Sequence, residues 1–436
     1  MAPGALSEAR CAASLGRGLD SSVPATVREA LDELGTEPTL AIIEVCAPGA
    51  PLLAGRALSH AAGLVVEEAP DCVVLGSSAH GVIAGRRDGA GAVEMEPAIS
   101  VWVAHLPGSR PRPFRLSASP GLHGGIAIHG LPEMTDHDRL ALLLADPWTL
   151  PADDVVAAFV RHGHPLPVAG GLVSGAQRRG DARLLLGTEV FDDGGVGVIL
   201  DQAAPVRVVV SQGCRPIGDA MTVTAAEGTA VRELAGRPAL ERIREIISSL
   251  DGPDQALAVR GLHVGIARDA HVDGSTAADY VIRGLLGVDA STGAITVGDD
   301  VPVGSLVCLH LRDADSADAD LRSTVQAAEG GMAPAGAYLV TCNGRGGAMF
   351  TSPDHDGALV REGLGTDAVG GFFAAGEIGP VGGANHLHGF TAVILVVDRY
   401  ADPGSTAEVA RPVSAESMLD ETLLDAELRS LLDPSP

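Results

Sequence analysis

The same order of local signals occurs three times along the chain, and this repetition restricts the fold more than any other feature. Each repeat reads as a strand, a helix, a second strand that enters a glycine-rich loop, and a closing strand. The repeats lie near residues 39–106, 140–201 and 337–397. Two parallel strands need a crossover between them, usually a helix, whereas a closing strand can pair antiparallel. The sequence therefore predicts an α/β fold of mixed β-sheets flanked by helices, built from repeated β-α-β-β units.

The passage between the second and third repeats has a different pattern, with a helix expected near 238–250 and several strands between 261 and 311. A chain of 436 residues is long enough for two domains. A Pro-, Arg- and Ser-rich stretch at 107–120 predicts a surface loop. The predicted segments are a lead-in at 1–38, a first domain at 39–215, a second domain at 216–400 and an acidic tail at 401–436 with an amphipathic helix.

The net charge argues against several classes of partner. It is −26, from 30 basic and 56 acidic residues, and such a chain repels phosphate backbones and anionic lipid, so we expect no nucleic acid and no membrane partner. The chain has no apolar run of about 18 residues and its first residues lack a signal-peptide pattern, which predicts a cytoplasmic protein. Its six cysteines form no close pair, so we expect no zinc module and no disulfide framework. The glycine loop at 344–346 matches neither a Walker nor a Rossmann fingerprint, and we expect no cofactor.

The densest candidate for a functional site is Cys342-Asn-Gly-Arg-Gly-Gly347, which directly follows a predicted strand. Glycines let a ligand approach the backbone closely, and the N–H groups of a strand-to-helix turn can face an anion. Arg345 adds a planar fork that suits a carboxylate or a phosphate. Taken alone, the motif is as well explained by an ordinary glycine turn that carries a surface arginine, and the case for an anion-binding loop depends on the next glycine loop.

A second glycine loop, Gly376-Glu-Ile-Gly-Pro-Val-Gly-Gly383, follows the next predicted strand and precedes Asn385 and His388. Turns that follow neighbouring strands of one sheet meet at the same edge. We therefore expect one pocket, in which Arg345 holds the carboxylate of a small polar ligand such as an amino acid and Glu377 holds its ammonium. The predicted ligand-binding residues are Cys342, Asn343, Gly344, Arg345, Gly346, Phe372, Phe373, Gly376, Glu377, Ile378, Gly379, Asn385 and His388. Since neighbouring residues of a strand face opposite sides, one phenylalanine should line this pocket and the other the core.

Three other interpretations of these residues stay open. An ion pair between Arg345 and Glu377 would only close the turn. Cys342 could act as a nucleophile with His388 as its base, but no hydrolase signature surrounds the cysteine. His386 and His388 could bind a metal, but their spacing does not single out a metal site. The pattern favours binding over catalysis.

Two further glycine-containing turns follow strands in the first half of the chain. One contains Ser77, Ser78 and His80, and the other contains Gln212 and Arg215. They predict either a second ligand site or simple turns.

Several long motifs, in a fixed order, resemble the FIST family, whose name stands for F-box and intracellular signal transduction proteins. The motifs are Ser211-Gln-Gly-Cys-Arg-Pro-Ile-Gly218, Leu285-Leu-Gly-Val-Asp289, Cys342-Asn-Gly-Arg-Gly346, Pro353-Asp-His-Asp356, Gly371-Phe-Phe-Ala-Ala-Gly-Glu-Ile-Gly-Pro-Val-Gly-Gly383 and Leu387-His-Gly-Phe-Thr391. The resemblance implies paired FIST N and FIST C domains and a sensory module that binds small ligands, with amino acids the usual suggestion. The family's C-domain pattern maps onto Cys342, Asn343, Arg345, Gly376, Glu377, Asn385 and His388.

The chain departs from the family in two respects. It has no segment that resembles a kinase, a cyclase, a chemoreceptor or an F-box, so we expect its signal to leave through a protein partner or through chemistry that is not linked to the chain. As an alternative function, the chain could be a scaffold that docks a protein partner through the amphipathic helix of its acidic tail. An acidic residue is usual in the family where His80 stands, so the resemblance does not extend to the first-half site.

Overall fold

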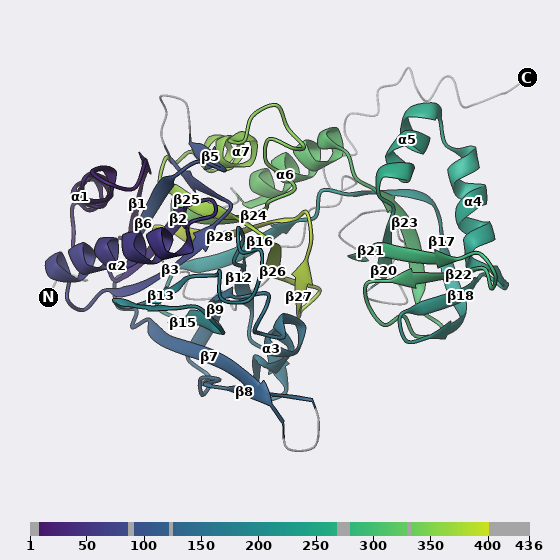
Figure 1. Ribbon diagram of the computed structural model, residues 1–436, viewed down its shortest axis with the longest axis horizontal. Coiled ribbons are helices and arrows are strands. Elements are labelled where there is room, and N and C mark those ends of the chain that lie inside the picture. Colours follow the sequence, from purple (N-terminus) through teal and green to yellow (C-terminus); the bar gives the residue numbers. More distant parts are fainter. Residues whose placement is uncertain (1–7, 86–90, 122–124, 268–279, 329–332, 401–436) are drawn as a thin grey trace, which may run out of the picture.

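The computed structural model describes residues 8–85, 91–121, 125–267, 280–328 and 333–400. Figure 1 shows a large lobe, which joins the first half of the chain to its last strands, and a smaller lobe that projects from it. Mixed sheets flanked by helices confirm the predicted α/β class. Within the described residues, no helix is long and apolar enough to cross a membrane.

The large lobe consists of three units, and in each a central strand, a helix, a second strand, a hairpin and a closing strand follow one another. The first contains β1 (Arg10–Arg17), α1 (Ser22–Leu34), β2 (Leu40–Cys46), α2 (Pro51–Glu68), β3 (Val73–Ala79), β4 (Gly81–Ala84), β5 (Ala92–Glu94) and β6 (Ala98–His105). The second contains β7 (Arg112–Pro120), β8 (Ile126–His129), β9 (Asp138–Ala145), α3 (Ala152–Ala158), β10 (Val160–Arg161), β11 (His164–Pro165), β12 (Val168–Leu172), β13 (Leu184–Leu186), β14 (Glu189–Phe191) and β15 (Gly195–Asp201). The third contains β16 (Val206–Ser211), α6 (Ala314–Ala328), β24 (Pro334–Cys342), α7 (His355–Leu364), β25 (Val369–Ala374), β26 (Gly376–Val381), β27 (Ala384–His388) and β28 (Ala392–Asp398).

Each unit builds its sheet in the same way. The central strand, β2, β9 or β24, pairs parallel with the strand that follows its helix and antiparallel with the last strand of its unit. The strand orders are β1-β6-β2-β3-β13-β14, β8-β7-β15-β9-β12-β26-β27 and β16-β28-β24-β25-β4-β5. The repeated units that the sequence predicts are therefore present as three matching sheets.

The three sheets exchange hairpins in a cycle. The hairpin β4–β5 leaves the first unit and pairs with β25 of the third. The hairpin β26–β27 leaves the third unit and pairs with β12 of the second, and β13–β14 leaves the second and pairs with β3 of the first. No unit completes its own sheet, so the three units form one folded body.

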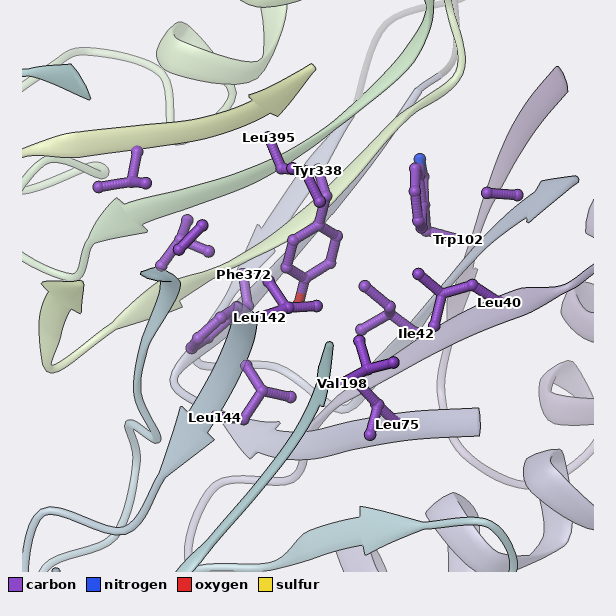
Figure 2. Packing of buried hydrophobic residues seen from close by; sticks show 14 of the residues in the cluster. Leu40, Ile42, Leu75, Trp102, Leu142, Leu144, Val198, Tyr338, Phe372 and Leu395 are labelled. Atoms are coloured by element: carbon purple, nitrogen blue, oxygen red, sulfur yellow. The ribbon is translucent and has the colours of Figure 1, made fainter. Parts of the chain in front are cut away.

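The inner faces of the three sheets share one hydrophobic core. Figure 2 shows Trp102 of β6, Leu142 of β9 and Tyr338 of β24 converging in it, so each sheet contributes. The outer faces are covered separately: α1 and α2 pack on the first sheet, α3 on the second, and α6 and α7 on the third. Sheets buried on both faces explain why these strands read as continuous apolar runs.

The smaller lobe is a barrel inserted between β16 and α6. Its strands β17, β23, β20, β21, β22 and β18 pair in that order, and β18 also pairs with β17, which closes the ring. Two helices pack on its apolar interior cluster. The elements are β17 (Arg215–Glu227), β18 (Ala230–Leu234), β19 (Arg237–Pro238), α4 (Ala239–Ser249), α5 (Gly252–Arg260), β20 (His263–Ala267), β21 (Tyr280–Asp289), β22 (Ala294–Val297) and β23 (Leu306–Leu311).

The expectation of a surface loop at 107–120 is wrong beyond residue 111, where the chain forms β7. Phe114 and Leu116 are alternate, buried positions of this strand and pack beside α3. The predicted boundary between the two domains, at 215/216, stays a prediction. It coincides with the first residue of the barrel, yet the strands that follow the barrel return to the large lobe.

Candidate functional site

Three residues of the predicted site, Cys342, Arg345 and Glu377, lie where the barrel meets the large lobe, close to Arg312 at the end of a barrel strand. Three hydrogen bonds cross this joint: Arg312 Nη2 donates to Gly389 O at 3.1 Å, Arg283 Nη1 donates to Leu387 O at 3.0 Å, and Gln212 Nε2 donates to Tyr280 O at 3.0 Å. A set of mutually close side chains lies at the joint, all of them buried or half-buried except Phe390, and we call it the joint cluster. Its members are Cys214, Arg312, Cys342, Arg345, Glu377 and Phe390.

Arg345 is buried, with 1% of its surface exposed, and its main partner is Asp356 rather than Glu377. Nε and Nη2 donate to the two Asp356 oxygens at 2.8 and 3.0 Å, a bidentate pair. Thr341 and His355 also contact this carboxylate. Burial alone would raise the pKa of Asp356, but the Arg345 charge and these hydrogen bonds hold it well below its usual range. Arg345 therefore forms an ion pair with Asp356 and not the suggested one with Glu377. Its role in holding a ligand carboxylate stays a prediction.

Glu377 is completely buried in β26. Its Oε2 accepts the Thr391 N–H at 2.9 Å, whereas Oε1 has no hydrogen-bond partner among the described residues. Burial raises its pKa to about 8, against the Thr391 hydrogen bond, the adjacent Cys342 thiol and the charges of Arg345 and Arg312. A fixed cation beside Oε1 would shift this carboxyl to its ionised form.

The predicted thiol and base do not form a pair in the described contacts. Burial and the neighbouring Glu377 raise the pKa of Cys342 to about 12, so the group is a thiol at neutral pH. His388 lies opposite Glu377 in the β26–β27 register, and its Nε2 hydrogen-bonds with Gly379 O at 3.0 Å. Burial lowers its pKa to about 3, with His386 adding to the effect. This arrangement does not activate a nucleophile.

Arg312 is a site residue that the sequence analysis missed. It follows β23, and its guanidinium carbon lies 3.8 Å from the centre of the Phe390 ring. Nη1 is 2.9 Å from His263 Nε2, and Nη2 is 3.4 Å from Cys214 Sγ. Its Nε is buried without a hydrogen-bond partner in the described part of the chain. In the sequence, its position directly after a strand is the one signal that could have indicated Arg312 as a site residue.

The loop Gly389–Thr391 contacts three ionisable members of the cluster through its backbone. Gly389 O accepts from Arg312, Phe390 O accepts from Arg345 Nη1 at 3.4 Å, and Thr391 N donates to Glu377. Phe390 has φ +60°, a left-handed conformation that is unusual for a bulky side chain. Its ring packs so closely on Gly344 that a Cβ at that position would overlap it.

The other glycines of the first motif contact the exchanged hairpin. A Cβ on Gly346 would overlap Glu94 Oε1, and Gly347 N donates to Glu94 Oε2 at 2.7 Å. Glu94 belongs to β5, and its Oε1 lies 3.9 Å from His80 Nε2. Glu94 therefore links His80, in the first half of the chain, to the glycine motif at 342–347. The large separation of these residues in the sequence gave no sign of this contact.

The remaining second-site residues lie in separate contact groups. Ser77 Oγ donates to the buried Glu44 at 2.6 Å, and Ser78 Oγ accepts the Arg183 N–H at 3.0 Å. Gln212 contacts the barrel through Tyr280, and Arg215 forms ion pairs with Asp254 and Asp313. These contacts do not bring the five residues together into one pocket.

Several residues of the predicted pocket face elsewhere. Phe372 packs in the shared core (Figure 2), Phe373 packs beneath α6 and α7, and Ile378 packs beside α3. Both phenylalanines are thus core residues on opposite faces of β25, so the expectation that one lines the pocket is wrong. Asn385 braces β12, because its Nδ2 donates to Leu166 O at 2.8 Å and its Oδ1 accepts the Val168 N–H at 2.9 Å.

Asn343 is exposed at the start of the loop, where its N–H donates to Ala374 O at 2.8 Å. Gly376 and Gly379 lie in β26, where side chains of neighbouring strands leave little room for a Cβ. No group of three potential metal ligands occurs among the residues with described positions. A separate surface cavity of about 520 Å³ lies between α1 and α2, and none of the candidate residues lines it.

Three interlocked sheets with an inserted barrel, and a buried polar cluster at the joint, define a two-part α/β protein with a candidate small-molecule site. The sequence matches the FIST N domain over residues 52–237 and the FIST C domain over residues 239–380, so the chain belongs to the FIST family. These domains are consistent with a sensory role in signal transduction.

Mycobacterial proteins are similar over most of the chain. Uncharacterized protein Rv0628c of Mycobacterium tuberculosis (strain H37Rv) is 45% identical over 328 residues, which is 74% of this chain and 84% of that protein. Uncharacterized protein Mb0898c of Mycobacterium bovis is 42% identical over 384 residues, which is 85% of this chain and 94% of that protein.

Proposed function

We propose that this FIST protein is a sensor that binds a small polar metabolite carrying a carboxylate and an amine, such as an amino acid, at the joint cluster. One observation carries the proposal: buried atoms of opposite charge type, Glu377 Oε1 and Arg312 Nε, lie in one cluster without hydrogen-bond partners among the described residues. Buried polar groups are nearly always hydrogen-bonded, so such atoms favour a ligand between them.

The loop Gly389–Thr391 supports the chemical class of this ligand. It presents carbonyl oxygens to the two arginines and an N–H to the carboxyl of Glu377. An amino acid presents the same pattern in a more strongly charged form, with carboxylate oxygens for guanidinium groups and an ammonium for a carboxylate.

The residues take different roles in this proposal. Arg312 receives the ligand carboxylate and Glu377 its ammonium. Arg345, which is engaged by Asp356, holds the loop and adds positive charge. The raised pKa of Cys342 disfavours the thiol-enzyme alternative. The tail helix proposed for partner docking lies at 401–436, outside the described residues.

A thermal-shift screen against amino acids and related metabolites tests the proposal. A ligand at 100 times its Kd stabilises the folded protein by about 2.7 kcal/mol, which raises Tm by a few degrees. Arg312→Gln and Glu377→Gln should lose the shift. Arg178→Ala, which alters an exposed arginine paired with Asp181, should keep it. Failure of every compound to shift Tm, or equal shifts in all variants, would contradict the proposal.

A further inference from the structure

The joint cluster is already occupied by a piece of the chain itself. Three consecutive residues, Gly389, Phe390 and Thr391, each form one backbone hydrogen bond with an ionisable cluster member. A ligand that needs Arg312 and Glu377 must compete with this loop for the same hydrogen bonds.

Phe390 holds the loop in place at an energetic cost. Its φ of +60° lies in the left-handed region, which is unfavourable for a bulky residue, and 38% of its surface stays exposed. Its ring lies against the Arg312 guanidinium on the barrel side and against Gly344 on the large-lobe side. Cation–π stacking and this close packing hold the ring between the two lobes.

We infer that the loop Gly389–Thr391 is an internal occupant of the joint site and that Phe390 is its latch, which must leave Arg312 and Gly344 before a ligand can enter. Release of the latch breaks one of the contacts that join barrel and large lobe, so ligand entry is coupled to the relative position of the lobes. The ligand in this inference rests on the proposed function. The latch itself rests only on the contacts of Phe390.

Release of the latch also uncovers thiols. Cys342 and Cys214 are 4% and 3% exposed, and both belong to the joint cluster. Cys72 lies in the separate core under α1 and α2 of the first unit and serves as an internal reference. The rate at which each cysteine reacts with N-ethylmaleimide therefore reports opening of the joint relative to opening elsewhere.

The test measures these alkylation rates by peptide mass spectrometry in the full-length protein without added ligand. Phe390→Ala should accelerate reaction at Cys342 and Cys214 by about tenfold or more and leave Cys72 unchanged. Gly344→Ala leaves the sequence of the loop Gly389–Thr391 unchanged, but its added Cβ overlaps the Phe390 ring. It should therefore also accelerate reaction at Cys342 and Cys214. Phe191→Ala is the matched control, because it removes a similar contact, with Arg115, away from the joint.

Unchanged rates at Cys342 and Cys214 in both joint variants would overturn the latch. Equal acceleration at all six cysteines would also overturn it, because that result indicates general destabilisation. Selective acceleration supports the latch even if no amino acid shifts Tm, so failure of the latch and failure of the proposed ligand are distinguishable.

Discussion

The hydroxyl of Tyr338 donates a hydrogen bond to Glu44 Oε1 at 2.5 Å and so joins the third unit to the first. Ser77 donates to the other oxygen of the same carboxyl at 2.6 Å. Tyr338 lies in the core that all three sheets share, and Figure 2 shows its hydroxyl pointing into that core. The buried Glu44 carboxyl is thus held by donors from two strands, β24 of the third unit and β3 of the first.

Glu44 should make the protein less stable as the pH rises. Burial raises its pKa from 4.5 to about 8, so the folded state keeps a proton that the unfolded state releases between these values. The contribution of Glu44 to the free energy of unfolding is therefore complete below pH 4.5 and falls by up to about 1.4 kcal/mol per pH unit until pH 8. Urea denaturation at pH 6.5 and 8 should show a smaller decrease for Glu44→Gln than for the natural chain. Identical pH dependence of the two proteins would refute this assignment.

Arg345→Leu should destabilise the protein strongly, by about 3–5 kcal/mol, because Asp356 stays buried without its cation. The double variant Arg345→Leu/Asp356→Leu should recover part of this loss, since no charge is left uncompensated. Chemical denaturation of the two single variants and the double variant gives the coupling energy. A loss below about 1 kcal/mol for Arg345→Leu would show that the pair is not a buried structural pair.

Gly346→Ala should lower stability by about 1–3 kcal/mol, because the added Cβ overlaps Glu94 and displaces it from the Gly347 N–H. Truncation of the obstacle in Gly346→Ala/Glu94→Ala should restore part of the loss. Gly63→Ala, in an exposed part of α2 with open space around its Cβ, is the control and should stabilise by up to about 1 kcal/mol. Equal effects of the two alanines would contradict the close approach of Glu94.

The sequence was informative where structure is local. Strand, helix and strand follow one another within each unit, and apolar runs such as 40–46 mark strands that are buried on both faces, so the three units could be recognised. The exchange of hairpins could not be recognised, because β4 pairs with the distant strand β25, with Val82 opposite Phe372, and no local signal distinguishes this partner from a nearer one.

The site was only partly predictable for the same reason. The motif glycines and Glu377 were found because glycine loops follow strands. The sequence suggests Glu377 as one possible ion-pair partner of Arg345 and does not indicate Asp356, because both acids lie in the family's motifs and sequence spacing does not measure distance. Arg312 was missed because it approaches the motif from the barrel, and only the folded chain brings it onto Phe390.

Calorimetric titration of an amino acid that passes the thermal screen, at pH 7 in two buffers of different ionisation enthalpy, tests the central claim most directly. Glu377 holds its proton in the free protein because burial raises its pKa to about 8, and a ligand ammonium beside it drives that proton off. We expect binding to release close to one proton, and Glu377→Gln to abolish this release. Binding without proton release, or release that persists in Glu377→Gln, would contradict a ligand held between Arg312 and Glu377.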